Sequence, residues 1–216
     1  LSLPLMLNKS LFVPTMGGEE KIVSQKALWR ALRLIPGILP FMLAFFLFND
    51  AVTTLTNNYS IVTSNLFHIS SSQLSLVTLL VIIMAGFGGL AWGAISDKIG
   101  AKKALIFLLL SWVIFLPALA LAQKYQLYFI FSLAAGLSIG GTSTVSRQIL
   151  TLLLPERILN YGFGIYAISE RASTIFGPLA WTAVLSLSGY RAAIMSMVVF
   201  QIISVILISK LPKTKV

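Results

Sequence analysis

Three charged residues lie deep inside long apolar stretches of the chain, and their positions suggest chemistry. They are Asp50, Glu170 and Arg171. At the centre of a membrane-spanning helix each such charge costs about 2.5–3.5 kcal/mol on insertion scales, unless it is paired or hydrated. We therefore expect all three to face a cavity or a partner rather than lipid. Either carboxylate could bind and release a proton, and Arg171 could bind a carboxylate, but a structural ion pair between two helices would satisfy these charges equally well.

The neighbours of these charges refine the expectation. Glu170 and Arg171 are adjacent, and adjacent residues on a helix point about 100° apart. One of them should therefore face a central cavity and the other a neighbouring helix. The stretch around Asp50 is unusually polar, and a water-lined face is the simplest cause. Its polar residues are Asn49, Thr53, Thr54, Thr56 and Asn57.

The remaining composition excludes several kinds of chemistry. The chain has no cysteine and one histidine, so no Cys/His metal site can be built, and we expect neither a metal nor another cofactor. No phosphate-binding loop, HExxH or G-x-S-x-G motif is present, and the carboxylates do not cluster with a nucleophile, so an enzyme is not expected. The net charge of +10 does not indicate a nucleic-acid partner, because the basic residues flank apolar runs.

Six apolar runs must position these residues. Hydrophobic residues make up 57% of the chain and charged residues 10%, far below the roughly 25% charge of soluble proteins. About 20 apolar residues span a bilayer as a helix. The sequence therefore predicts an all-α membrane protein, embedded in the lipid bilayer, whose six-helix bundle occupies residues 36–216. The predicted spans are 37–58, 74–95, 104–122, 127–153, 161–186 and 191–209.

Lysines and arginines concentrate on alternate loops. Twelve lie on one side of the predicted membrane, and only Lys124 and Arg191 lie on the other. The positive-inside rule then places the N-terminal segment, the loops 96–103 and 155–160, and the C-terminus in the cytoplasm. The twelve are Lys9, Lys21, Lys26, Arg30, Arg33, Lys98, Lys102, Lys103, Arg157, Lys210, Lys213 and Lys215.

Residues 1–35 precede the bundle. The apolar stretch 1–7 is expected to be the end of an upstream membrane helix, which would make this chain a fragment or a truncated product. Residues 21–35 alternate basic side chains with apolar ones and carry Trp29, a pattern typical of an amphipathic helix on the cytoplasmic membrane surface. A linker helix packed on neighbouring protein is an equally good alternative.

Small residues recur at the spacing of close helix contacts. Two such sets are Ala85, Gly89 and Gly93, and Gly136 with Gly140. Within the fifth span, the pair at 177–178 (Gly-Pro) predicts a kink or a broken helix.

One short loop has the most specific spacing in the chain. The sequence GAISDKIGAKK runs from Gly93, with a carboxylate at Asp97, a bend-forming glycine at Gly100 and basic residues at Lys102 and Lys103. This spacing resembles the signature loop of the major facilitator superfamily, which follows the second helix of each six-helix half. The resemblance implies that the loop locks and releases the two halves of a transporter during alternating access.

Arg147 is predicted near the cytoplasmic end of the fourth span. There it could reach Asp97 or Glu156 and form part of an inner gate. Snorkelling of its long side chain to the lipid headgroups is the simpler explanation.

Three further segments resemble one branch of the superfamily. They are FFLFNDAVTTL (45–55), GLSIGGTSTVSRQILTLLLPE (136–156) and YGFGIYAISERASTIFGPL (161–179). They are similar to the seventh, tenth and eleventh helices of the vacuolar amino-acid effluxers of fungi and their bacterial relatives. The resemblance implies the C-terminal half of a twelve-helix transporter, built as 3+3 inverted repeats. Ala51 and the pair Glu170-Arg171 depart from the family's Gly and Gly-Lys, which leaves the substrate open.

The sequence thus predicts half of a secondary transporter that works with a missing N-terminal six-helix half. It would move a small solute, with amino acids as the implied class, by using an ion or proton gradient through Asp50 or Glu170. The alternative is a truncated six-helix protein that transports nothing and serves as an interaction subunit or is a degenerate product. The short loops favour a bacterial plasma membrane over a vacuolar one.

Overall fold

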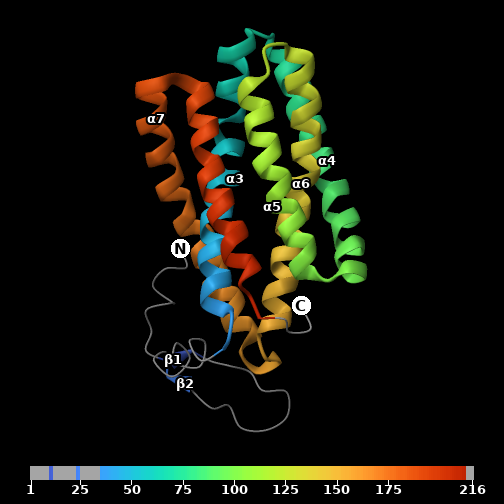
Figure 1. Cartoon of the computed structure of the whole chain (residues 1–216), viewed down its shortest axis with the longest axis vertical. Coiled ribbons are helices and arrows are strands. Elements are labelled where there is room, and N and C mark those ends of the chain that lie inside the picture. The colour runs from blue at the N-terminus through green and yellow to red at the C-terminus, as the bar shows by residue number, and fades with distance from the viewer. Residues whose placement is uncertain (1–9, 12–22, 25–34, 213–216) are drawn as a thin grey trace.

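The computed structural model describes residues 10–11, 23–24 and 35–212, and most of these residues form a bundle of long helices (Figure 1). The helices are α3 (Ile38–Phe67), α4 (Ser71–Ile99), α5 (Ala101–Leu121), α6 (Tyr125–Leu153), the short 3-10 helix η1 (Glu156–Ile158) and α7 (Leu159–Ser209). Within the described residues, five helices are long and apolar enough to cross a membrane. The prediction of an all-helical membrane bundle is confirmed at this level.

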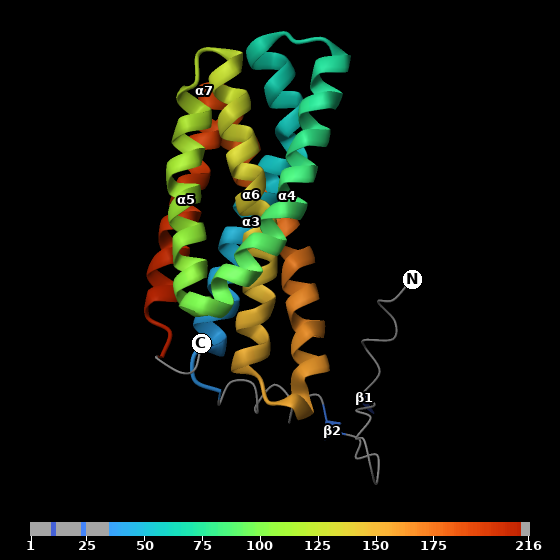
Figure 2. The ribbon, with the colours of Figure 1, turned by 90° about the vertical axis from the view of Figure 1, so that its right-hand side faces the viewer.

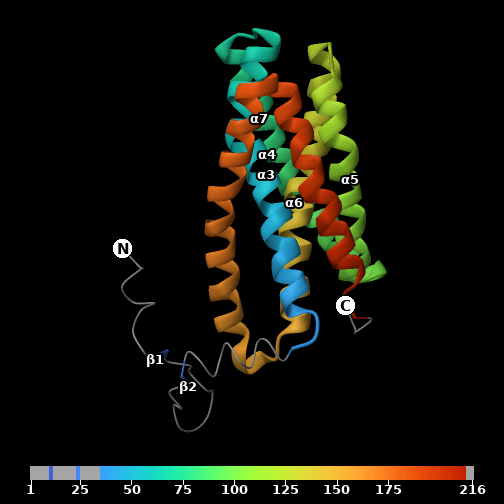
Figure 3. The same cartoon turned by 60° about the vertical axis from the view of Figure 1, so that its left-hand side comes forward.

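The longest helix, α7, folds back on itself. It contains 51 residues, and its residue Gly189 has φ 78° and ψ 179°, outside the helical region. Figures 1 and 3 show the orange part of α7 and the red part that follows it running in opposite directions. We call residues 159–188 the first arm and residues 190–209 the second arm. The arms cover the predicted fifth and sixth spans, but the count of six stays a prediction because α7 is one continuous element.

Local residues explain how the helices begin and end. Ser70 caps α4, because its hydroxyl accepts the Gln73 N–H at 3.3 Å while the Gln73 side-chain oxygen accepts the Ser70 N–H at 3.1 Å. Gly100, with φ 90°, ends α4 and precedes the first residue of α5. Glycine adopts this positive φ without a steric penalty. The predicted loop 96–103 is therefore a corner made by a single residue.

The closest helix contact joins α4 to α6. A Cβ on Gly88 would collide with the backbone of Leu137, and one on Gly140 would collide with the backbone of Ala85. A Cβ on Gly136 would lie 2.8 Å from the Val81 carbonyl oxygen. The small residues thus let the two backbones touch, as predicted from their spacing.

Apolar side chains inside the bundle form two clusters. The first, around Phe45 and Leu108, lies towards the end where α3 begins and α7 ends. The second, around Trp112 and Trp181, lies towards the opposite end. The two clusters meet on α3 near Asp50, which is fully buried.

Two elements of the N-terminal segment are described. Strand β1 (Ser10–Leu11) pairs antiparallel with β2 (Val23–Ser24). Residues 23–24 belong to the stretch predicted as an amphipathic helix. The other residues of that stretch up to 34, and the predicted end of an upstream helix at 1–7, lie outside the described residues.

Candidate functional site

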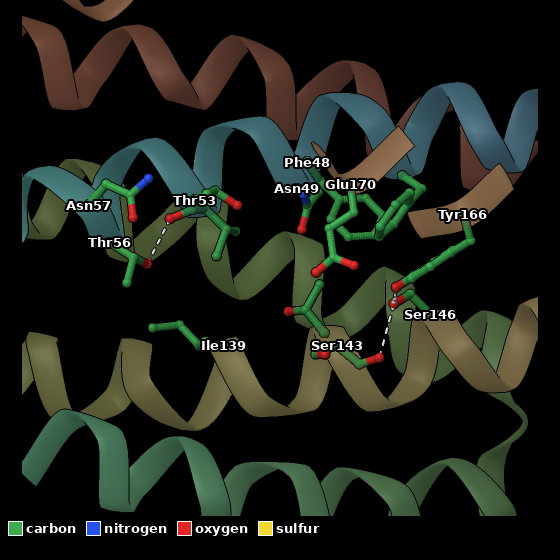
Figure 4. Close-up of a pocket in the computed structure, with 13 residues that line it drawn as sticks. Phe48, Asn49, Thr53, Thr56, Asn57, Ile139, Ser143, Ser146, Tyr166 and Glu170 are labelled. Carbon is green, nitrogen blue, oxygen red and sulfur yellow. Dashed lines mark hydrogen bonds between the residues drawn. The ribbon is translucent and has the colours of Figure 1, made fainter. Parts of the chain in front are cut away.

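A polar cavity of about 220 Å³ lies between α3, α6 and the first arm of α7 (Figure 4). Its polar wall on α3 repeats with helical spacing, which places these side chains on one face and explains the polar stretch seen in the sequence. The lining residues are Phe45, Phe48, Asn49, Val52, Thr53, Thr56 and Asn57 from α3, Ile139, Thr142, Ser143 and Ser146 from α6, and Tyr166 and Glu170 from α7.

Glu170 is the one charged residue among those that line the cavity. Figure 4 shows its carboxylate between α3 and α6, on the side of Ser143. One turn earlier, the Tyr166 hydroxyl lies 2.8 Å from the Ser146 hydroxyl, and its ring stacks on Phe45 with a centroid separation of 3.9 Å. The first arm of α7 therefore presents an acidic group and an aromatic group to the same space.

Arg171 does not share this space. Both Arg171 and Glu170 are exposed in this bundle, but only Glu170 is among the residues that line the cavity. Across residues 35–212, neither Arg171 nor Glu170 forms a salt bridge. Of the two adjacent charges, Glu170 is thus the one that faces the cavity.

Asp50 points from α3 towards α7 rather than into the cavity. It is 0% exposed, and its Oδ1 accepts the backbone N–H of Gly177 at 2.7 Å. A Cβ on Gly177 would lie 2.5 Å from that oxygen, so a larger residue there would displace the carboxylate. Asp50 Oδ2 and the hydroxyl of Thr54, one turn further along, are buried without a hydrogen-bond partner among the described residues.

Asn49 makes the neighbouring contact between the same helices. Its amide nitrogen donates to the Ser173 hydroxyl at 2.7 Å, and Ser173 donates to the Glu170 carbonyl at 2.8 Å. Asn49 and Asp50 thus hold consecutive turns of the first arm of α7. Gly189 is the one residue inside α7 with non-helical backbone angles, so the helix is not broken at 177–178, and the predicted alternative of a kink there stays a prediction.

The predicted gate loop ties α4 to α6. Asp97 Oδ1 accepts the side-chain N–H of Gln148 at 2.8 Å, and the Gln148 oxygen accepts the Ser96 hydroxyl. Arg147, the predicted partner, is exposed, and the adjacent Gln148 makes the hydrogen bond instead. Gln148 was missed because an uncharged amide gives no sign of charge complementarity in a sequence.

The other loop residues have different surroundings. Lys102 donates to the carbonyls of Ser209, at 2.9 Å, and Leu211, so it caps the end of α7. Lys103 is exposed, and Gly93 lies beside Thr144 of α6.

The opposite end of the bundle has a cap of the same kind. Arg191 donates from Nη1 to the carbonyls of Ala120, at 2.5 Å, and Ala122, at 2.8 Å, at the end of α5. Sequence reasoning had assigned Arg191 only to the side of the membrane that is poor in positive charge. Among the described residues, no group of three His, Cys, Asp or Glu could hold a metal ion.

Comparison with solved structures identifies the fold. The POT family transporter PepTSo matches with a TM-score of 0.69 and 15% identity, over 79% of this chain and 36% of that one. A D-xylose–proton symporter matches with a TM-score of 0.64 and 16% identity, over 81% of this chain and 47% of that one. At these identities the likeness shows the fold alone. The fold is that of major facilitator transporters, as the gate-loop motif predicted.

The family follows from sequence comparison. The family described as "Vacuole effluxer Atg22 like" matches residues 21–215, and the chain belongs to it. Autophagy-related protein 22 of Saccharomyces cerevisiae (strain YJM789) is 25% identical over 159 residues, which cover 68% of this chain and 30% of that protein. The Vanderwaltozyma polyspora protein of the same name is 28% identical over 169 residues, 71% of this chain and 32% of that protein. The chain spans about a third of the length of these relatives. It is a multi-pass integral membrane protein from a family of effluxers rather than of enzymes.

Proposed function

We propose that this chain is half of a secondary active transporter, which moves a small solute across a membrane by alternating access. Amino acids are the proposed solute class. The observation that carries the proposal is the polar cavity inside the bundle, with Glu170 in its wall and Asp50 buried beside it. Polar groups at this depth are costly, and they mark solute or ion pathways in membrane proteins.

We propose that the bundle consists of two inverted three-helix repeats. The first repeat is α3, α4 and α5, and the second is α6 with the two arms of α7. The support is a constant spacing of 89 residues. It separates FGGLAW (87–92) from FGPLAW (176–181), and it separates Gly100 from Gly189, the two corner glycines with positive φ. Inverted repeats of this kind are a common construction of secondary transporters.

The two basic caps have the same spacing. Lys102 begins α5 and caps α7, whereas Arg191 begins the second arm of α7 and caps α5. The capped carbonyls, at 209 and 211 and at 120 and 122, are also 89 residues apart. Such reciprocal contacts are expected between two helices related by a twofold axis in the membrane plane.

The second half of the transporter is proposed to pack against α4 and the first arm of α7. Figure 2 shows the upper part of α4 and the first arm on the same side of the bundle, with α5 on the other side. Both carry exposed large apolar side chains. They include Leu79, Phe87 and Leu90 on α4, and Ile168, Phe176 and Leu179 on α7.

Asp50 is the proposed coupling carboxylate. It is fully buried outside the cavity, and among the described residues one of its oxygens has no hydrogen-bond partner, so a charged Asp50 is poorly stabilised. A proton would neutralise the carboxylate and provide a donor for the hydroxyl of Thr54. Both Asp50 and Thr54 lie against Gly177. Because Asp50 also holds Gly177, a change in its protonation would alter the contact between α3 and α7.

The orientation and the membrane are proposed from the charge distribution. Lys98, Lys102, Lys103, Arg157 and Lys210 lie at the end of the bundle where α3 begins and α7 ends. The positive-inside rule makes this end cytoplasmic. The relatives named above are fungal, and the description of their family refers to the vacuole. The bacterial plasma membrane therefore stays a prediction.

The experiment uses the full protein that contains this chain, reconstituted in proteoliposomes with a mixture of labelled amino acids. The wild type should accumulate an amino acid under a pH gradient. Asp50→Asn should abolish this accumulation but retain exchange of solute across the membrane without a gradient. Glu156→Gln, which removes an exposed carboxylate in η1, is the matched control and should behave as the wild type.

Two results would contradict parts of the proposal. Full accumulation by Asp50→Asn would refute coupling through this residue. If the wild type shows neither accumulation nor exchange of any amino acid, the transport proposal fails and the non-transporting subunit becomes the better account.

A further inference from the structure

We propose that Glu170 binds the positively charged amine of the solute, so that this wall of the cavity recognises an ammonium group and not a carboxylate. This inference rests on the proposed transport function and goes beyond it. It predicts that amines without a carboxylate bind this half as well as amino acids do.

The charges around the cavity carry the first step. Among the described residues that line the cavity, Glu170 is the one with a charge, and none is a lysine, arginine or histidine. Arg147 lies outside the lining, although it is close enough to the Tyr166 hydroxyl to act on it electrostatically, as Glu170 also is. Across the described residues no salt bridge neutralises Glu170. The cavity is therefore built to receive a cation.

The groups beside Glu170 suit an ammonium group in particular. An ammonium has three N–H donors and needs several acceptors at once. Asn49 uses its amide nitrogen on Ser173, which leaves its amide oxygen as an acceptor. Figure 4 shows Asn49 and Ser143 on either side of the Glu170 carboxylate. Carboxylate, amide and hydroxyl oxygens thus come from three different helical segments.

The rest of the cavity suits a short apolar tail. Phe45, Phe48, Val52 and Ile139 line it alongside the polar groups, and the stacked ring of Tyr166 closes one part of the wall. These apolar groups can contact the alkyl chain of a small amine or an amino acid whose ammonium lies at Glu170.

The test compares three solutes with one branched alkyl chain. Leucine carries an ammonium and a carboxylate, isoamylamine carries the ammonium alone, and 4-methylpentanoate carries the carboxylate alone. Their binding to the purified full-length protein is measured by isothermal titration calorimetry. Glu170→Gln should weaken leucine and isoamylamine by a similar factor, at least about tenfold for the loss of a charge-assisted hydrogen bond. It should leave 4-methylpentanoate unchanged.

Two further variants separate binding from folding. Glu170→Asp keeps the charge and should retain more amine binding than Glu170→Gln. Glu156→Gln makes the same chemical change at an exposed site and should bind all three solutes as the wild type does. Thermal unfolding checks that each variant is folded.

Several outcomes would overturn the inference. One is equal binding of the amines by the wild type and Glu170→Gln, and another is a loss of binding in Glu170→Gln that affects leucine but not isoamylamine. The inference also fails if the wild type binds only 4-methylpentanoate or binds none of the three solutes. In each case the transport proposal still stands if proteoliposomes accumulate or exchange a solute, and it falls with the inference if they do neither.

Discussion

Two helix crossings in this bundle each place a glycine at the contact, but the groups that the two glycines contact differ. Where α4 meets α6, Gly88 lies against the backbone of Leu137; where the first arm of α7 meets α3, Gly177 lies against the side chains of Asp50 and Thr54. The two glycines are 89 residues apart, within matching FG-x-LAW segments. One crossing is held by backbone packing, and the other places a buried carboxylate in the same position. If the two crossings are copies within the proposed repeats, the scaffold has kept its geometry while one copy has acquired the carboxylate.

Removal of the Asp50 carboxylate should have the largest effect on stability and transport. The structural change should be confined to the crossing of α3 and α7. Asp50→Leu removes the acceptor that the buried Gly177 N–H has on α3, which should lower the free energy of unfolding by about 1–3 kcal/mol and abolish transport. Asp50→Asn keeps an acceptor oxygen and should lose gradient-driven transport with much less destabilisation. Thermal unfolding in detergent and proteoliposome flux measure the two effects. Equal destabilisation by both variants would show that the hydrogen bond is unimportant.

Adding a methyl group to each glycine tests the comparison directly. Gly88→Ala meets backbone that cannot rotate away, so it should cost about 1–3 kcal/mol of stability. Gly177→Ala meets the ends of two side chains, which can turn aside at a smaller cost, but it should displace Asp50 and impair transport more. Gly164→Ala, which has open space around its new methyl group, is the control. The comparison fails if Gly177→Ala is the less stable variant and transports normally.

The two basic caps should have smaller and equal effects. Lys102→Met and Arg191→Met each leave carbonyls at one helix end without a cationic donor, at an expected cost of about 0.3–1 kcal/mol each. Lys103→Met, at the exposed neighbour of Lys102, should cost less than either. Unfolding midpoints of the three variants provide the measurement. A large difference between Lys102→Met and Arg191→Met would argue against equivalent repeats.

The smallest expected change is in the gate loop. Gln148→Leu removes the hydrogen bond to Asp97, which lies in an exposed environment, so stability should fall by about 0.5 kcal/mol. The transport rate should change, because α4 and α6 are then less firmly joined at the proposed cytoplasmic end. Arg147→Met should alter the rate less than Gln148→Leu does. The reverse order would restore Arg147 as the partner of Asp97.

Hydropathy predicted the helices well and their ends less well. The first span was expected to end at 58, yet α3 continues to Phe67. Its last turns are rich in Asn, Ser and Thr, which resemble a loop in a sequence. In the structure several of them bond back to the carbonyl four residues earlier, as Asn58 does to Thr54 and Asn65 to Ile61, both at 2.8 Å. Local bonds of this kind give no hydropathy signal.

The candidate site was predicted by residue type and not by pairing. Depth alone singled out Asp50 and Glu170, since a charge inside an apolar run needs a special environment. The partner of Asp50 is the backbone N–H of Gly177, 127 residues away, and no pattern of side chains in the sequence predicts a contact with a backbone group. The serines and Tyr166 of the cavity were missed because each is unremarkable within its own helix. The repeated FG-x-LAW segment was readable in the sequence and would have matched Gly88 with Gly177.

The corners at Gly100 and Gly189 leave almost no slack between the helices that they join. Each replaces a loop with a single residue, so a tilt of α4 displaces the start of α5 and, through the Lys102 side chain, pulls on the far end of α7. In the same way, a tilt of the first arm of α7 displaces the start of the second arm through Gly189 and, through Arg191, pulls on the end of α5. Movement at either end of the bundle is thereby transmitted between the two proposed repeats, and the bundle is expected to rock as a body instead of flexing helix by helix.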